Sequence, residues 1–185
     1  MIFTIDWEPY FCFRPYSKFW EENDPLVEEP TMYLLDLLRR HQIKAIWYCL
    51  GWLTIRENKL FDRIFEDGHI FGDHTFYHKC DGIGYYARVN KEVGNPFRAP
   101  KFIGQKRLYS GGFWFRALPY LVSKKLLEQS GVFYIHPHDV LLEHTDCGNP
   151  VKTFERRLGL KTVRDKLERL CREAEFGEPM VSNTY

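Results

Sequence analysis

The sequence predicts a single α/β domain whose strands run parallel. Short apolar runs alternate along the chain with segments that have helical periodicity, which is typical of a parallel sheet connected by helices. Polar residues able to do chemistry follow several of these runs at the same end. The 185 residues contain no repeat, linker or low-complexity segment and are enough to bury a substantial core. We therefore expect one domain over residues 1–185.

Four apolar runs are expected to form strands. Each is short, rich in β-branched or aromatic residues, and bounded by polar or turn-forming residues. The runs are residues 2–5, 44–49, 69–71 and 132–135.

Helices are expected between the runs. Pro30 can open the first, because the missing N–H costs nothing in a first turn. Its apolar stripe continues toward His41 and consists of Met32, Leu34, Leu35 and Leu38. A short helix follows at 59–66. Another has Pro119 in its first turn, ends at Gly131, and carries Leu118, Leu121, Val122 and Leu126. The last is expected to start with a capping sequence at Thr162 and to continue to Ala174.

Composition gives limited information about the partners and the compartment of the protein. Lys and Arg total 26 against 25 Asp and Glu, so net charge gives no reason to expect nucleic acid or an anionic membrane as partner. The aromatic share of 17% is high, and such rings either fill a core or line a sugar groove. Both roles are open for Trp7, Trp47, Trp114 and Tyr120. The five cysteines lack a CxxC pair, which favours reduced thiols in the cytosol.

The N-terminus bears on location. An apolar strand runs from Met1 straight into Asp6, which leaves no room for a secretory signal. No run of about 18 apolar residues is present, so no membrane span is expected. We therefore expect a cytoplasmic protein, which could sit peripherally at the inner face of the membrane.

Two histidines four residues apart, His74 and His78, have the spacing of two ligands to one metal ion. Glu8, close to Asp6 after the first apolar run, could complete the set. Two imidazoles and one carboxylate leave coordination positions open, which is more typical of a hydrolytic site than of a structural one. The alternatives without a metal are that the two histidines lie on a surface turn, and that Asp6 and Glu8 are simply polar residues at the end of a strand.

The positions of these residues strengthen the metal hypothesis. Asp6 and Glu8 follow the first run, the two histidines follow the third, and His136 follows the fourth. In parallel α/β folds the chemistry gathers where strands end. His138 could compete with His136 for a catalytic role. Further metal sites could involve Cys80 or the pair His144 and Cys147, although spacing alone supports neither.

The residues also resemble a known family, the polysaccharide deacetylases with a NodB homology domain. The likeness is greatest to the branch with an Asp-x-Glu first motif, which is associated with exopolysaccharide and O-antigen biosynthesis. Five motifs appear in family order: Thr4-Ile5-Asp6-Trp7-Glu8, His74-xxx-His78, Arg98-Ala99-Pro100, Gly111 to Arg116 followed by Leu118-Pro119-Tyr120, and Phe133-Tyr134-Ile135-His136-Pro137.

The resemblance implies a fold and a set of roles. The fold would be a distorted, incomplete (β/α) barrel, shortened here because the spans from His78 to Arg98 and from Lys101 to Gly111 are short for the family. Asp6 would be the general base, held charged by Arg98, and His136 the general acid. The metal ligands would be Glu8, His74 and His78. Substrate binding or oxyanion stabilisation would fall to Lys101, Trp114 and Arg116.

The implied activity is metal-dependent removal of an N-acetyl group from a sugar in surface polysaccharide biosynthesis. Zinc is the expected ion, because it can lower the pKa of bound water to about 7. The expected partner is an N-acetylated sugar or glycan precursor, lipid- or nucleotide-linked. The alternative is a catalytically weakened glycan-binding or assembly protein that retains the metal site. Retention of Asp6, Arg98 and His136 together favours the enzyme.

Overall fold

The computed structural model describes residues 1–12, 14, 18–78, 110–144 and 146–179. Its four strands are β1 (Ile2–Trp7), β2 (Ala45–Cys49), β3 (Ile70–Asp73) and β4 (Val132–Ile135). They form one sheet in the order β3-β2-β1-β4, and each neighbouring pair is parallel. The α/β prediction is therefore confirmed, and the parallel sheet is compatible with part of a barrel.

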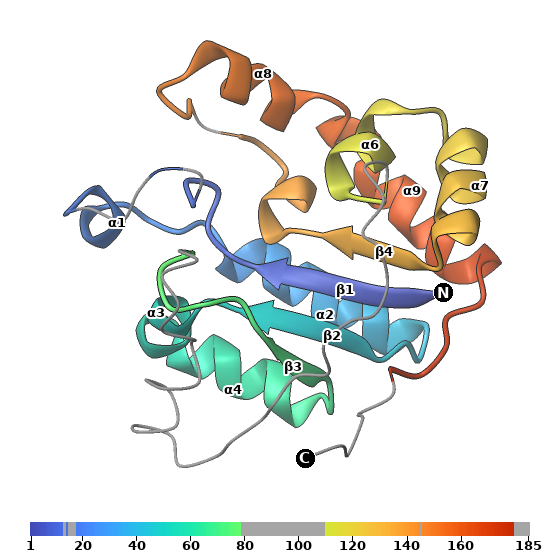
Figure 1. The fold of residues 1–185 in the computed structure, drawn as a ribbon, viewed down its shortest axis with the longest axis horizontal. Coiled ribbons are helices and arrows are strands. Elements are labelled where there is room, and N and C mark those ends of the chain that lie inside the picture. Colours follow the sequence, from blue (N-terminus) through green and yellow to red (C-terminus); the bar gives the residue numbers. More distant parts are fainter. Residues whose placement is uncertain (13, 15–17, 79–109, 145, 180–185) are drawn as a thin grey trace.

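Helices connect and cover the strands (Figure 1). Their bounds are α1 (Lys18–Glu22), α2 (Glu28–Arg40), α3 (Gly51–Arg56), α4 (Asn58–Glu66), α6 (Gly112–Ala117), α7 (Tyr120–Ser130), α8 (Pro150–Arg157) and α9 (Leu160–Glu173), with a 3-10 turn, η1, at Pro137–Val140. In Figure 1, α6, α7 and α9 gather beside β4, whereas α3 and α4 lie beside β3.

β1 occupies the centre of the molecule. Its side chains are buried on both faces of the sheet from Phe3 onward, as expected where helices cover a parallel sheet. Phe3 contacts Phe133 of β4 edge to face, with ring centroids 5.0 Å apart. Pairing of β1 with both β2 and β4 fixes the relative position of the polar residues that follow these strands.

Two sequence predictions about helices were wrong in detail. The last helix begins at Leu160 with Gly159 as its N-cap, so Thr162 lies inside it and donates its hydroxyl hydrogen back to the carbonyl of Gly159. Gly159 takes a left-handed conformation (φ 74°), which a glycine adopts without strain, and this starts the helix early. The expected apolar stripes are also narrower than predicted, since Met32, Leu121 and Val122 are exposed.

The aromatic side chains divide between core and surface. Trp7 and Trp47 are completely buried in the core, and Tyr120 is buried with its hydroxyl donating to Glu173. A sugar groove lined by these three residues is therefore excluded. Trp114 is partly exposed. None of the helices in the described part of the chain is long and apolar enough to cross a membrane.

Candidate active site

The carboxyl edge of the sheet brings together the residues that sequence analysis singled out at strand ends. Asp6 is the penultimate residue of β1, and Glu8 is the first residue after that strand. His74 and His78 follow β3, and His136 follows β4. Parallel strands present their carboxyl ends at one edge, so residues 6, 74 and 136 meet although they lie more than 60 positions apart.

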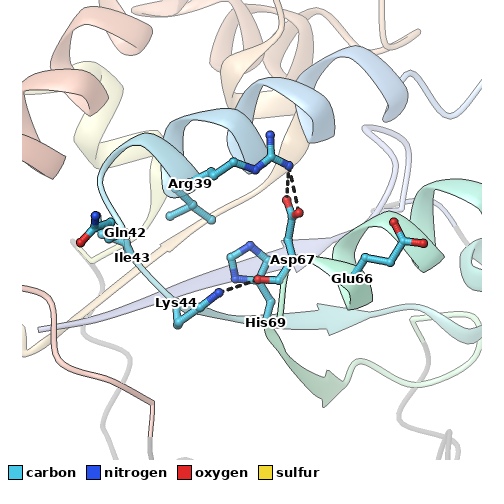
Figure 2. Close-up of a pocket in the computed structure, with 8 residues that line it drawn as sticks. Arg39, Gln42, Ile43, Lys44, Glu66, Asp67 and His69 are labelled. Atoms are coloured by element: carbon cyan, nitrogen blue, oxygen red, sulfur yellow. Dashed lines mark hydrogen bonds and ion pairs between the residues drawn. The ribbon is translucent and has the colours of Figure 1, made fainter.

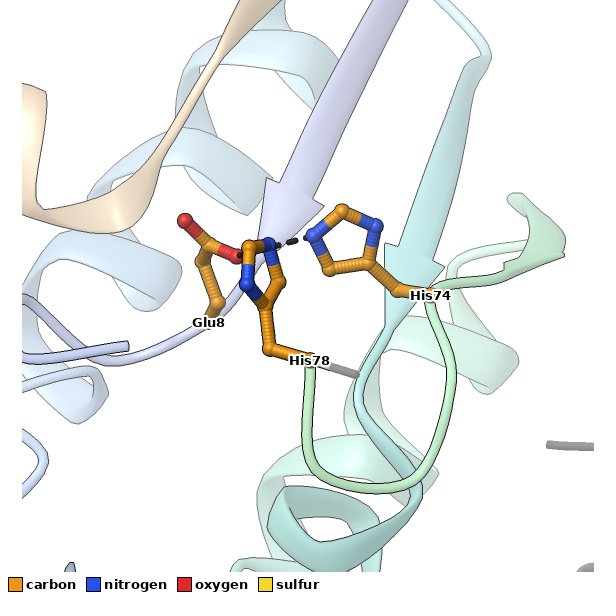
Figure 3. Close-up of side chains that lie close together, drawn as sticks. All are labelled: Glu8, His74 and His78. Atoms are coloured by element: carbon orange, nitrogen blue, oxygen red, sulfur yellow. Dashed lines mark hydrogen bonds and ion pairs between the residues drawn. The ribbon is translucent and has the colours of Figure 1, made fainter. Parts of the chain in front are cut away.

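Glu8, His74 and His78 form a compact group (Figure 3). The Nε2 atoms of His74 and His78 lie 2.8 Å and 3.1 Å from the same carboxylate oxygen of Glu8. Glu8 is 4% exposed, whereas the two rings are nearer the surface. One ligand atom from each residue lies within 4.8 Å of the others, which is the arrangement needed to hold one metal ion.

The loop that carries the two histidines is held by the start of α3. The backbone N–H groups of Gly51 and Trp52 donate to the carbonyls of Thr75 and Phe76, at 3.1 Å and 3.2 Å. These N–H groups lack a partner within the helix, because the first turn of any helix leaves its donors unused. Thr75 and His78 both take positive φ angles (63° and 58°), and these turns direct the loop back toward Glu8.

The electrostatics of the group favour a cation. Burial alone would raise the pKa of Glu8, but hydrogen bonds from His74 and His78 and the charge of His136 hold it well below its ordinary value. The hydrogen bond to Glu8 raises the pKa of His78. Glu8 is therefore a charged carboxylate with two imidazoles aimed at it. This donor set suits a divalent ion with open coordination positions.

His136 lies between this group and Asp6. Its Nε2 atom is 3.4 Å from Oε1 of Glu8 and 3.8 Å from Oδ2 of Asp6. On the other side of the ring, Nδ1 is 2.9 Å from Oδ2 of Asp139. Burial lowers the pKa of His136, but the hydrogen bond and charge of Asp139 outweigh it and raise the pKa overall. The ring therefore presents Nε2 to the site.

Asp139 was missed by sequence analysis. It lies in η1, only three residues after His136, and is 1% exposed. Burial would raise its pKa, but the charge of Arg116 and the hydrogen bond from His136 keep it well below its ordinary value. A usable signal was present in the sequence, because a carboxylate three residues after a histidine, in a turn that begins with a proline, can reach back to that histidine.

The remaining predicted site residues fall into two groups. Arg98 and Lys101 lie outside the described residues. Trp114 and Arg116 are in α6, where Trp114 packs edge to face on Phe113. Arg116 is buried and paired with Asp139 at 3.0 Å. Arg116 is therefore paired with the carboxylate that bonds Nδ1 of His136, on the side of the ring away from Nε2.

A second group of possible metal ligands comprises His136, His138 and Asp139. The two rings are stacked, with centroids 4.6 Å apart and planes only 16° from parallel. A metal ion binds an imidazole nitrogen in the plane of its ring, and one ion cannot lie in two stacked planes. Asp139 is also already paired with Arg116. This geometry suits positioning of His136 better than metal binding.

His138 is not placed to compete with His136. Its ring is 1% exposed, and neither nitrogen has a hydrogen-bond partner within the described part of the chain. Burial and the charge of Arg156 hold its pKa well below the ordinary value, so the ring is neutral. Cys147 lies 3.9 Å from His144, and no third ligand among the described residues joins that pair. Cys80 lies outside the described residues.

A cavity of about 440 Å³ lies at the opposite, amino edge of the sheet (Figure 2). Its basic side chains are already engaged: Arg39 donates two hydrogen bonds to the Asp67 carboxylate, and Lys44 donates to the Asp67 carbonyl at 2.6 Å. His69 immediately precedes β3 and lines the same cavity. The cavity is therefore remote from the residues that meet at the carboxyl edge.

Fold and site together define an α/β protein with a candidate metal-dependent hydrolytic centre. The sequence matches the family model for polysaccharide deacetylase over residues 21–101 and that for a domain of unknown function, DUF3473, over residues 88–181. The second model covers half of the chain and describes a domain associated with polysaccharide deacetylases. The chain belongs to the polysaccharide deacetylase family.

Two curated relatives agree with this assignment. The peptidoglycan-N-acetylglucosamine deacetylase of Bacillus cereus is 34% identical over 83 residues, which cover 40% of this chain and 30% of the relative. The peptidoglycan-N-acetylmuramic acid deacetylase PdaA of Bacillus subtilis is 25% identical over 137 residues, covering 62% of this chain and 51% of the relative. The chain thus spans about a third of the first relative and about half of the second. No solved structure matches it.

Proposed function

We propose that the chain is a metal-dependent carbohydrate N-deacetylase, with zinc as the ion. The observation that carries the proposal is the convergence of Glu8, His74 and His78 next to Asp6 and His136. Family membership and the deacetylase activities for which both relatives are named support the reaction class. The substrate is an N-acetylated sugar, and the products are acetate and the free amine.

The proposed metal ligands fit the ion by the chemistry of their atoms. Two imidazole nitrogens and a carboxylate kept charged face one point, and hydrolytic zinc sites use such sets. When bound, the ion would polarise the amide carbonyl and lower the pKa of the attacking water. This supplies the electrophile that an amide requires, because an amide carbonyl resists unassisted attack by water.

Proton transfer is assigned to the two residues beside the ligands. Asp6 takes a proton from the attacking water on a carboxylate oxygen. His136 carries a proton on Nε2 and gives it to the leaving amine nitrogen, since its pKa is raised and its Nδ1 is engaged by Asp139. Asp6 and His136 face each other across 3.8 Å, so both can reach one reacting amide.

The remaining parts of the assignment are proposals that rest on the sequence. They are a role in surface polysaccharide biosynthesis, a carrier-linked precursor as substrate, action in the cytoplasm, orientation of Asp6 by Arg98, and an oxyanion donor at Lys101. The relatives are named for peptidoglycan, which is a polymer. The assay must therefore distinguish a polymeric substrate from a carrier-linked precursor. We also retain one domain over residues 1–185, because β4, from the segment matched by the second family model, pairs with β1 in the same sheet.

Acetate release by the purified, zinc-supplemented chain tests the proposal. The substrates are N-acetylglucosamine oligomers, peptidoglycan fragments, and lipid- or nucleotide-linked N-acetylated sugars, with chelator-treated protein as the blank. We expect release that chelation abolishes and zinc restores. Release only from polymers would overturn the precursor assignment. If the zinc-bound protein released no acetate from any substrate, the result would refute the enzymatic function and favour the glycan-binding alternative.

A further inference from the structure

Arg116 is the most completely engaged cation in the described part of the site. Its side chain is 1% exposed and lies between η1 and the end of α8. Nε donates to Oδ1 of Asp139 at 3.0 Å. Its two terminal nitrogens donate to the backbone carbonyls of residues 155, 156 and 158 at 2.5–3.1 Å. The guanidinium therefore joins the last turn of α8 to a single carboxylate of η1.

Asp139 passes this connection on to His136. While Oδ1 accepts from Arg116, Oδ2 accepts from both the backbone N–H and the ring Nδ1 of His136, each at 2.9 Å. Both oxygens are thus occupied by fixed donors. The imidazole is held in one orientation, with Nδ1 protonated and Nε2 toward Asp6 and Glu8.

The start of α6 is shaped to admit this carboxylate. A β-carbon on Gly112 would lie 2.5 Å from Cγ of Asp139, so only a residue without a side chain permits the observed packing. Four residues later the same helix supplies Arg116, and an interval of four places both residues on one helix face. α6 therefore provides both the space for Asp139 and its counter-ion.

We propose that Arg116 is a positioning residue that acts on His136 through Asp139, and not a residue that contacts substrate. This deepens the proposed deacetylase and rests on it for the catalytic consequence. The planar fork of arginine suits the role, because it bonds a carboxylate and several carbonyls at once in fixed directions. A lysine could keep the charge beside Asp139 but could not hold α8 as well.

The experiment compares variants by the ring signal of His136 and by kinetics. In ¹⁵N-histidine-labelled, zinc-supplemented protein, the Nδ1–H resonance of His136 is assigned through its loss in His136→Gln. Arg116→Gln removes the charge, Arg116→Lys keeps it, and Asp139→Asn breaks the next link. The matched control is Lys166→Met. Lys166 also donates to helix-end carbonyls, those of residues 115, 116 and 118, but is not bonded to Asp139.

We expect the Nδ1–H signal in the parent, Lys166→Met and Arg116→Lys, and its loss or displacement in Arg116→Gln and Asp139→Asn. We also expect kcat to fall at least tenfold in these last two variants while KM stays within twofold, and Arg116→Lys to recover most of the loss. All comparisons are made at temperatures where circular dichroism shows each variant folded.

Three outcomes would overturn the proposal. The first is an unchanged ring signal and kcat in folded Arg116→Gln. The second, decisive even if Arg116→Gln does not fold, is loss of both the ring signal and kcat in a folded Arg116→Lys variant. The third is a rise in KM without a fall in kcat in either folded Arg116 variant. The ring signal is independent of turnover. If the signals behave as expected but no form of the protein releases acetate, the deacetylase function fails while the positioning by Arg116 stands.

Discussion

The Oδ2 atom of Asp139 accepts two hydrogen bonds from His136, one from its backbone N–H and one from its ring Nδ1, both at 2.9 Å. The backbone N–H of Asp139 in turn donates to the carbonyl of His136 at 3.0 Å. This reciprocal pair closes the η1 turn and fixes the imidazole with the same few atoms. A local capping interaction thereby becomes part of the candidate active site.

Removing both histidine ligands should abolish metal binding. In a His74→Ala/His78→Ala variant only Glu8 of the three proposed ligands remains, and one carboxylate does not retain zinc against dialysis. We expect about one zinc per parent chain and nearly none in the variant, measured by elemental analysis. His41→Ala is the control, because His41 follows the C-terminal end of α2 and its ring is hydrogen-bonded to Glu168. Equal zinc content in parent and double variant would refute the site.

Asp6→Asn should separate metal binding from turnover. The amide is nearly isosteric but cannot take a proton, so zinc content should remain while acetate release falls by about 10²- to 10⁴-fold. Asp36→Asn, in the exposed α2 ion pair with Arg40, should leave the rate unchanged. An Asp6→Asn enzyme with near-parental kcat would remove Asp6 from the role of base.

Metal binding should release protons and weaken in mild acid. The hydrogen bond to Glu8 raises the pKa of His78 in the metal-free protein, and a histidine ligand must lose its proton to bind. As pH falls through this raised pKa, protons compete with the ion. We expect lower zinc affinity at pH 6 than at pH 7.5, and calorimetric heats that depend on the ionisation enthalpy of the buffer. Heats independent of buffer at both pH values would contradict this.

Gly112→Ala should disturb the site from a distance. The new β-carbon would clash with Asp139, whose carboxylate cannot move without losing Arg116 or His136. We expect a loss of about 1–3 kcal/mol in the free energy of unfolding, measured in urea, together with a lower kcat. Gly177→Ala is the matched control, since among the described residues its β-carbon would meet only Ile2, at 3.8 Å. Equal effects of the two substitutions would show that the packing at Gly112 is not special.

His69 should make stability depend on pH away from the candidate active site. Burial and the charge of Lys44 lower its pKa from 6.5 to about 4. Between these values the unfolded chain binds a proton that the folded protein does not, so stability falls as pH falls. We expect the parent to lose about 2 kcal/mol more than His69→Asn between pH 7 and pH 5 in urea unfolding. The asparagine can still accept the N–H of Ala45, as Nδ1 does at 3.3 Å. Parallel pH profiles would show that His69 does not have this role.

Much of the architecture could be predicted from local pattern. The four apolar runs became the four described strands within about one or two residues, because a buried strand of a parallel sheet must be apolar on both faces. The rule that polar residues follow such strands at one edge identified Asp6, Glu8, His74, His78 and His136. Helix ends were less predictable. The final helix starts at Leu160 because Gly159 adopts a left-handed conformation as its N-cap. A glycine can adopt this conformation without strain, but its presence in the sequence does not predict that it will.

The sequence by itself determined which residue types the candidate site contains and at which end of the sheet they lie. Those facts depend on alternation of short apolar and helical segments and on the ligand spacing of His74 and His78. Only the tertiary structure decided that Arg116 is paired with the carboxylate that bonds His136, and that His138 is buried and stacked against His136. Such placements depend on how α6, η1 and α8 pack together. That packing is set by contacts between residues far apart in the chain, which no local pattern records.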